Sequence, residues 1–278
     1  MIHIVTVHWR NDRWIDTQLE YLARHIGHPY RVYAFLNDIA AAHNNKFFYV
    51  STEPIESHPF KLNLLADVAA SKSDSPDDWL IFLDGDAFPI GDLVAYGKHK
   101  LSGYALAAVQ RKENNGDPQP HPCFCLTTVG FWKSIHGDWG KGHKWRNNQN
   151  ELVTDVGGKL LQLLGENNVE WYPMTRSNKK NLHPVFFGVY DDVVYHHGSG
   201  FRSGISRMYR LEKKKELEES AGWLTAMKYA RRFGYAKKLL ARILERRAMR
   251  LARMESKRLN EYVFDLIGKD PVFYKIFQ

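Results

Sequence analysis

Residues 79–90 read Trp-Leu-Ile-Phe-Leu-Asp-Gly-Asp-Ala-Phe-Pro-Ile, and the fold is decided here. A short apolar run, which is typical of a buried strand, leads directly into two carboxylates, Asp84 and Asp86. Carboxylates this close repel each other, and an aspartate is rarely buried unless it is paired or holds a cation. The stretch therefore predicts a core strand that delivers two metal ligands to the edge of a sheet, where open α/β folds bind their ligands. The alternative interpretation is a polar turn after a core strand.

Strand and helix patterns alternate over the first two hundred residues. Short links between such elements predict an α/β fold with a mostly parallel, Rossmann-like sheet covered by helices. Strands are expected at residues 2–9, 30–36, 79–83, 104–109, 169–173 and 193–197, and helices at residues 14–26, 59–68 and 155–164.

The composition is that of a globular protein, with 44% hydrophobic and 25% charged residues among 278. No run approaches the ~18 apolar residues that cross a bilayer, and the start of the chain lacks a signal-peptide pattern, so we expect a cytoplasmic location. Cys123 and Cys125 are the two cysteines. Their spacing suits neither a zinc site nor a disulfide, so they are expected to be apolar packing residues facing the same side of an extended segment.

The positive charge is concentrated in the C-terminal part. Residues 207–262 hold 17 Lys and Arg against 7 Asp and Glu, whereas residues 1–206 hold 20 against 22. This imbalance divides the chain into a catalytic domain, residues 1–205, and a basic amphipathic helical extension, residues 206–278. Such a helix can lie on an anionic membrane surface at the inner face of the membrane, or it can pack on its own catalytic domain. Nucleic acid is not an expected partner, because the basic run lacks a binding motif and interleaved aromatic residues.

Residues 112–122 are polar and rich in proline. A loop of this length beside a site is either a lid or a passive surface loop.

Three segments together resemble the GT-A fold of nucleotide-sugar glycosyltransferases. The Asp84-Gly85-Asp86 segment is trailed by Gly91-Asp92-Leu93, residues 195–200 read Tyr-His-His-Gly-Ser-Gly, and residues 4–8 form the first strand. The likeness covers residues 1–202 and is greatest to the retaining family-eight type. Two departures concern residues 201–203, Phe-Arg-Ser in place of Lys-Pro-Trp, and residues 123–128, which replace the usual Asn-x-Gly acceptor segment. The stereochemistry of transfer therefore stays open.

The resemblance implies a divalent cation and a nucleotide-diphosphate sugar as donor. A cation that bridges both phosphates makes the diphosphate a better leaving group. Oxygen ligands suit Mg²⁺ or Mn²⁺, and an added imidazole favours Mn²⁺. Asp86 is expected to bind the metal directly, with Asp84 as a second ligand or a ribose contact. His197 is the preferred third ligand and His196 the alternate, because neighbours on a strand face opposite sides.

Five further residues are candidates for holding the donor. Lys61 lies in the first turn of an expected helix, where free N–H groups attract anions, and could contact the diphosphate or the donor sugar. Arg202 could hold the leaving phosphate in place of the family's lysine. The base and ribose are assigned to residues that follow the first strand, namely Thr6, His8 and Arg10.

Asp155 is the candidate catalytic residue. An inverting transferase needs a base for the acceptor hydroxyl, whereas the plainer role of Asp155 is a helix N-cap. Trp132, Trp139 and Trp145 could form a platform for acceptor sugar rings, or each could belong to the core.

The sequence thus predicts a metal-dependent transferase that moves a hexose to a hydroxyl of a glycan or a lipid-linked acceptor. Two rival classes stay open. A phosphatase of the haloacid-dehalogenase type also uses Asp-x-Asp after an apolar strand, with later acidic pairs such as Asp191-Asp192. A non-catalytic adaptor would keep the fold and bind partners through the basic helix.

Overall fold

The computed structural model describes residues 1–183, 185–198, 207–220, 222–223, 228 and 234–278. The chain divides into two compact units. The first comprises residues 1–180, 187–201 and 274–278, and the second comprises residues 181–186 and 202–273. The predicted boundary after residue 205 falls outside the described residues.

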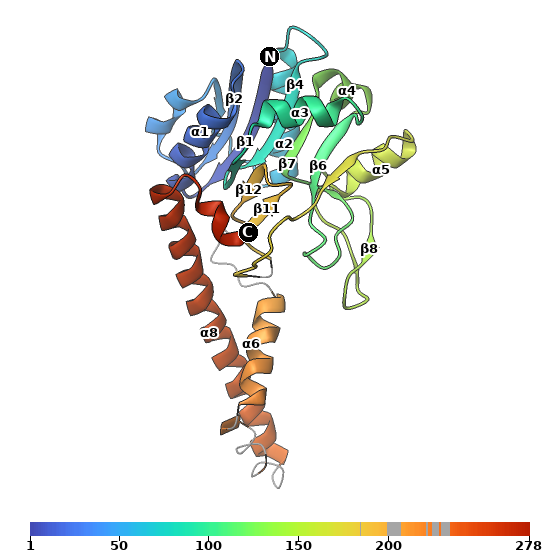
Figure 1. The fold of residues 1–278 in the computed structure, drawn as a ribbon. Coiled ribbons are helices and arrows are strands. Elements are labelled where there is room, and N and C mark those ends of the chain that lie inside the picture. Colours follow the sequence, from blue (N-terminus) through green and yellow to red (C-terminus); the bar gives the residue numbers. More distant parts are fainter. Residues whose placement is uncertain (184, 199–206, 221, 224–227, 229–233) are drawn as a thin grey trace. The chain divides into compact units, whose positions relative to one another are not determined.

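A seven-stranded sheet forms the centre of the first unit (Figure 1). Six of its strands run parallel, and only β7 runs antiparallel to its neighbours β4 and β6. The predicted α/β class with a mostly parallel sheet is confirmed. In spatial order the strands are β10 (Tyr172–Met174), β6 (Leu106–Gln110), β7 (Pro120–Thr128), β4 (Trp79–Asp84), β1 (Ile2–Trp9), β2 (Tyr30–Asn37) and β3 (Tyr49–Ser51).

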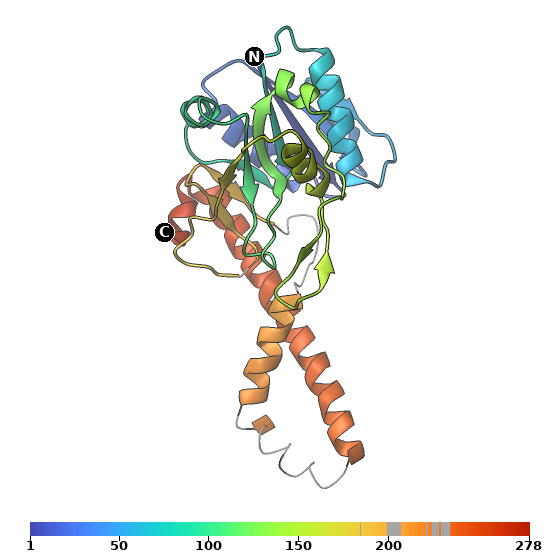
Figure 2. The ribbon, with the colours of Figure 1, turned by 90° about the vertical axis from the view of Figure 1, so that its right-hand side faces the viewer.

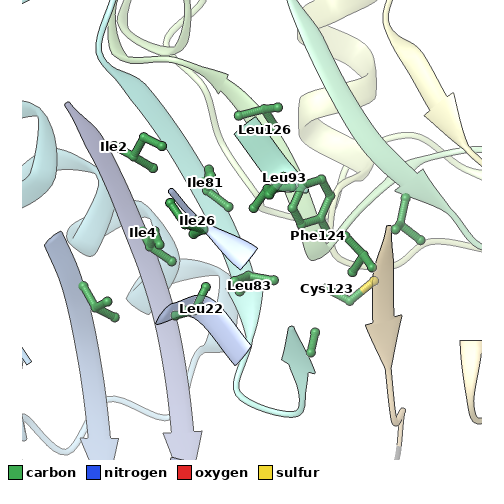
Figure 3. Close-up of a cluster of buried hydrophobic side chains, with 14 of the residues drawn as sticks. Ile2, Ile4, Leu22, Ile26, Ile81, Leu83, Leu93, Cys123, Phe124 and Leu126 are labelled. Carbon is green, nitrogen blue, oxygen red and sulfur yellow. The ribbon is translucent and has the colours of Figure 1, made fainter. Parts of the chain in front are cut away.

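Helices cover both faces of this sheet (Figures 1 and 2). Residues of β1 alternate between the faces, with Ile4 in one hydrophobic cluster and Val5 in the other. The first cluster takes in Leu22 of α1 (Arg13–His25) and Leu93 of α3 (Leu93–Leu101), as Figure 3 shows. The second cluster draws on three further helices, α2 (His58–Ser71), α4 (Val129–Ser134) and α5 (Gly158–Glu166).

Side-chain caps fix where α2 and α3 begin. Ser57 accepts a hydrogen bond from the backbone N–H of Phe60 at 3.4 Å, and Pro59 occupies the first turn of α2. Asp92 accepts from the N–H groups of Val94 and Ala95 at the start of α3. These bonds satisfy N–H groups that a helix start leaves without partners.

A smaller antiparallel sheet joins the end of β4 to the late part of the first unit. Its order is β11 (Gly188–Tyr190), β12 (Val194–His196) and β5 (Ala87–Pro89). Because β5 follows the Asp84-Gly85-Asp86 turn directly, this sheet ties β12 to the acidic residues. A two-stranded ribbon, β8 (Trp145–Arg146) with β9 (Leu152–Val153), precedes α5.

β7 corrects two sequence-based expectations. The expected loop 112–122 ends early, since β7 begins at Pro120. The β6–β7 register shifts between Ala108 and Val109, so strand alternation is interrupted. Cys123 therefore lies in the first cluster and Cys125 in the second, and the prediction that both face one side is wrong. Both thiols are buried and free, as expected of packing residues.

The second unit contains α6 (Arg207–Glu219) and α8 (Gly234–Lys269), which contact each other. Lys213 of α6 lies 2.7 Å from Glu255 of α8, and Arg210 lies 3.4 Å from Glu245. A short 3-10 helix, Phe273–Phe277, follows α8 along the chain and belongs to the first unit from Tyr274 on. Within the described part of the chain, no helix has the length and apolar character that crossing a bilayer requires.

Candidate metal centre

The carboxyl end of β4 carries the acidic pair. Asp84 is the last residue of β4, and Asp86 follows in the turn that leads into β5. β4 lies between β1 and β7, so the apolar strand before the pair is buried. The side chains of Asp84 and Asp86 are 18% and 6% exposed. Both carboxylates therefore lie at a sheet edge with little access to water.

His196 joins the two carboxylates. One ligand atom from each of Asp84, Asp86 and His196 lies within 4.8 Å of the others. His196 Nε2 is 3.5 Å from Asp84 Oδ2 and 3.5 Å from Asp86 Oδ1. The antiparallel pairing of β12 with β5 sets this arrangement, because it places His196 opposite Ala87, the residue after Asp86.

His197, which the sequence favours as the third ligand, points elsewhere. Its Nδ1 is 2.9 Å from the Tyr195 hydroxyl, and its ring centre is 4.5 Å from that of Trp14. Successive strand residues face opposite sides, so Tyr195 and His197 share the interior side while His196 faces the carboxylates. The structure thus places the alternate histidine beside the acidic pair.

Two more histidines, absent from the sequence-based candidates, lie near the carboxylates. His58 opens α2, and its Nε2 is 3.3 Å from Asp84 Oδ1. His121 lies on β7 with its ring centre 6.1 Å from that of His196. The backbone N–H of Cys123 donates to His121 Nδ1 at 3.1 Å. Each comes from a different element, so no local pattern marks them.

The electrostatics favour ionised carboxylates. Burial acts to raise the pKa of Asp84, but the hydrogen bond and charge of His58 and the charge of His196 outweigh it and hold this pKa well below its usual range. Burial opposes ionisation of Asp86 too, and His196 again lowers the pKa. For His121, burial and the charge of Arg111 lower the pKa well below the ordinary value. The centre therefore combines two anionic ligands with a neutral imidazole nearby.

This donor set fits a divalent cation. Asp84 Oδ1 is buried, and His58 Nε2 lies 3.3 Å from it. Two carboxylates with one imidazole suit Mn²⁺, and carboxylates alone suit Mg²⁺. Among the described residues, Asp84, Asp86 and His196 are the one group of three such side chains that could hold a metal.

Thr6 and His8 lie in the interior, bonded to Gln18 of α1. The Thr6 hydroxyl donates to Gln18 Oε1 at 3.1 Å, and His8 Nε2 is 3.2 Å from the same oxygen. All three side chains are fully buried. The contacts to base and ribose that the sequence suggests for Thr6 and His8 are therefore not open to a nucleotide in this structure.

The three basic candidates differ in their surroundings. Arg10 is exposed, and its Nε donates to Asp38 Oδ2 at 3.1 Å. Lys61 is only 4% exposed, and no described residue forms an ion pair or hydrogen bond with its ammonium group. Burial lowers the pKa of Lys61, and the charge of Asp38 partly opposes this. Arg202 lies outside the described residues.

Asp155 is half-buried and does not cap α5. The helix begins at Gly158 with Gly157 as its N-cap, and Asp155 Oδ1 accepts from the backbone N–H of Val156 at 2.8 Å. The N-cap interpretation of Asp155 is therefore wrong.

Two of the three candidate platform tryptophans belong to the core. The ring centres of Trp132 and Trp139 lie 4.6 Å and 5.1 Å from that of Phe82. Trp145 is half-buried on β8, and its Nε1 donates to the backbone oxygen of Asn115 at 3.3 Å. Trp145 alone of the three could meet an acceptor.

The acidic pair Asp191-Asp192 forms a turn. The Tyr96 hydroxyl donates to Asp191 and the Ser177 hydroxyl donates to Asp192, each at 2.8 Å. Both aspartates have positive φ, between β11 and β12. They therefore shape a hairpin. A phosphatase of the rival type would need a later acidic pair at the metal, and Asp191 and Asp192 are not part of the metal cluster.

A buried charged group anchors the segment that the sequence presents as a loop. The Tyr190 hydroxyl donates to Glu113 at 2.6 Å, and Arg176 Nε lies 3.5 Å from the same carboxylate oxygen. Arg111 is buried as well. Glu113 thus links the start of this segment to β11.

No known protein-family model matches the chain, and no curated protein matches it. The solved structures found to be similar include glycosyltransferases. The apo form of GlyE from Streptococcus pneumoniae has a TM-score of 0.40 and 17% identity, over 61% of this chain and 44% of GlyE. TarS of S. aureus has a TM-score of 0.33 and 15% identity, over 50% of each chain.

The catalytic domain of Drosophila β1,4-galactosyltransferase 7, in complex with xylobiose, has a TM-score of 0.39 and 11% identity, over 71% of each chain. Of the full length of GlyE, this chain matches less than half. With TM-scores below 0.5, these likenesses are too weak to identify an activity.

Proposed function

We propose that this chain is a metal-dependent glycosyltransferase that moves a sugar from a nucleoside-diphosphate donor to a hydroxyl of a glycan or a lipid-linked acceptor. The observation that supports this best is the meeting of Asp84, Asp86 and His196 at the carboxyl edge of a mostly parallel sheet. Ligands of open α/β sheets bind at that edge. The donor set also suits the cation that accompanies a nucleoside diphosphate.

Within this proposal, Asp86 and His196 bind the cation directly, and Asp84 binds the cation or the donor ribose. Bound Mn²⁺ or Mg²⁺ would supply the positive charge that turns a diphosphate into a better leaving group. His58, 3.3 Å from Asp84 Oδ1, holds that carboxylate in place and keeps it ionised.

Lys61 is the residue that we assign to the donor diphosphate. A buried ammonium group is costly unless an anion compensates it. Lys61 lies near the start of α2, where N–H groups and the helix dipole also favour an anion, and His58 of the same turn reaches Asp84. Anionic diphosphate would therefore satisfy Lys61 next to the metal.

The remaining candidates keep more general roles. Arg10 is proposed to contact the nucleoside from the end of β1, and Arg202 to contact the leaving phosphate. Asp155 is proposed as an acceptor contact or as the base of an inverting reaction.

The test compares the melting temperature of the purified chain in EDTA, with Mn²⁺, and with Mn²⁺ plus each common nucleoside diphosphate. A ligand that binds only the native state raises the melting temperature. We expect one diphosphate to stabilise the protein only when Mn²⁺ is present, and Asp86→Asn to remove that stabilisation. Asp67→Asn, on an exposed position of α2, is the control and should keep it.

Sugar release from the matching nucleotide sugar, dependent on Mn²⁺ and lost in Asp86→Asn, would support transfer. Phosphate release from simple esters without a nucleotide requirement would instead establish the phosphatase. A stable fold that binds neither metal nor nucleotide would favour the adaptor.

The exposed face of α8 supports a second proposal, which concerns the acceptor. Leu239, Ile243, Arg246, Arg250 and Met254 are exposed and recur every three or four residues, so they share one face of the helix. The basic side chains on and beside this face form no ion pair with a described residue: Arg242, Arg246, Arg247, Arg250, Arg253, Lys257 and Arg258.

Apolar side chains flanked by free positive charges match an anionic lipid surface, where both kinds of contact contribute. We propose that α8 holds the enzyme at the inner face of the membrane, close to a lipid-linked acceptor.

A further inference from the structure

The side chain of Gln18 lies under the turn that carries the two carboxylates. Its Nε2 donates to the backbone oxygens of Asp84 and Ala87, both at 2.8 Å. These two oxygens flank Gly85 and Asp86, so one amide group spans the turn from end to end.

The backbone oxygens of Asp84 and Ala87 fix the orientation of this amide, because a carbonyl oxygen can only accept a hydrogen bond. Thr6 Oγ1 donates to Gln18 Oε1 at 3.1 Å, and His8 Nε2 lies 3.2 Å from the same oxygen. A side-chain amide has two N–H donors and an oxygen with two lone pairs. Both N–H groups must therefore face Asp84 and Ala87, which leaves Oε1 to accept from Thr6 and His8, and a flipped amide would lose both bonds to the turn.

The network is dry. Thr6, His8 and Gln18 are each fully buried. In such surroundings a hydrogen bond is stronger, and an unpaired polar group is more costly, than in water. A rigid connection therefore runs from β1 through α1 to the turn, at the place where Asp84 and Asp86 must keep their spacing for one ion.

We propose that Gln18, held by Thr6 and His8, is a positioning residue that fixes the Asp84–Ala87 turn in the geometry that binds the metal. This inference rests on the proposed metal-dependent function. Groups that orient metal ligands from behind typically change metal affinity by 10- to 100-fold when they are removed.

The experiment measures the affinity of the full chain for Mn²⁺ by titration and electron paramagnetic resonance, together with its melting temperature in EDTA. Gln18→Met keeps the length of the side chain and removes both donors. Gln162→Met makes the same chemical change at an exposed position of α5 and is the control. We expect Gln18→Met to weaken Mn²⁺ binding at least tenfold in protein that is still folded, and the control to leave it unchanged.

A double-mutant cycle separates positioning from packing. Thr6→Val removes one donor to the amide oxygen and should weaken Mn²⁺ binding to a smaller degree. The double variant should bind Mn²⁺ no more weakly than Gln18→Met alone, because Thr6 acts only through the amide. Should Gln18→Met fail to fold, the loss of Mn²⁺ affinity in folded Thr6→Val carries the test.

The outcomes distinguish the two proposals. If the unaltered chain binds Mn²⁺ and Gln18→Met binds it within twofold, with only the melting temperature lowered, then the positioning role is overturned and the metal function stands. If the unaltered chain does not bind Mn²⁺, with or without nucleoside diphosphates, then both are overturned.

Discussion

One peptide step separates His196 from His197, and strand alternation decides which imidazole reaches the acidic pair. His196 Nε2 lies 3.5 Å from both carboxylates, whereas the ring of His197 lies against Trp14 on the interior side. A change at either position removes the same chemical group from a different environment. The two substitutions should therefore have different consequences.

We expect His196→Gln to weaken Mn²⁺ binding at least tenfold with little change in the melting temperature of the metal-free protein. His197→Gln should do the reverse, because its ring is buried and bonded to Tyr195. Titration with Mn²⁺ and thermal unfolding in EDTA measure the two effects. Loss of Mn²⁺ binding in His197→Gln but not in His196→Gln would contradict this assignment.

The buried carboxyl group of Asp117 should make the free energy of unfolding depend on pH. Its side chain is buried, and burial raises its pKa to about 6 despite the opposing hydrogen bond from the backbone N–H of Gln119. The unfolded chain ionises near pKa 3.9. The protonated form is therefore favoured by folding, so its contribution is complete below pH 4 and is lost as the pH rises through 6.

Through this group the free energy of unfolding should fall by about 2 kcal/mol between pH 4 and pH 7, since each pKa unit corresponds to ~1.4 kcal/mol and part of the ~2-unit difference is already lost at pH 4. Asp117→Asn cannot ionise and should lack this part of the pH dependence. Urea denaturation of both proteins at a series of pH values gives the difference. Parallel pH profiles for the two proteins would contradict the prediction.

At the scale of elements, pairing registers and tight turns place the site. The pairing of β12 with β5 sets His196 opposite Ala87, and the turn before α5 lets that helix start beside β7. Gly157 in this turn has a φ of +97°, and a Cβ there would lie 2.0 Å from the backbone oxygen of Pro120. Only glycine fits without moving β7.

Gly157→Ala should therefore destabilise the protein by several kcal/mol, because strain at positive φ adds to a clash with backbone. Gly165→Ala is the matched control: it lies inside α5, and a Cβ there would meet nothing within 4 Å. The control should stabilise the protein by about 0.5–1 kcal/mol. Chemical denaturation of both variants measures these changes, and equal effects would contradict the account.

At the scale of the whole molecule, charge is divided between two units. Within the second unit some basic residues are paired, as Lys213 is with Glu255, while the exposed arginines of α8 form no ion pair with a described residue. Removing residues 206–278 would confuse the test of membrane binding, because Phe277 belongs to the first unit and stacks there on Phe187 and Tyr195. Charge reversal on α8 avoids this difficulty.

Reversing Arg246, Arg250 and Lys257 to Glu should lower the affinity for vesicles of anionic phospholipid at least a hundredfold, at about 1 kcal/mol for each basic residue near the surface. Reversing Lys213, Lys214 and Arg210 is not a suitable control, since these pair with Glu245 or Glu255. Sedimentation with anionic and with neutral vesicles measures binding. If the unaltered chain bound both kinds of vesicle equally, the proposal would be contradicted.

Local patterns in the sequence determined most of the framework. The apolar run into Asp84 predicts β4, helical spacing predicts α1, and alternating elements predict a mostly parallel sheet, because burial of periodic apolar faces is a local property of the chain. β7 was not predicted from these patterns, because its proline-rich start is typical of a loop. Its antiparallel position between β4 and β6 depends on strands that are distant in the sequence.

Only the tertiary structure decided which side chains surround the acidic pair. His58 and His121 come from a helix start and from β7, and Gln18 on α1 resembles any polar residue on a helix until Thr6 and His8 are seen beside it. The choice of His196 over His197 follows from which face of β12 is turned toward Asp86. Sequence spacing gives the alternation of a strand, but the direction of each face is set by what the strand packs against.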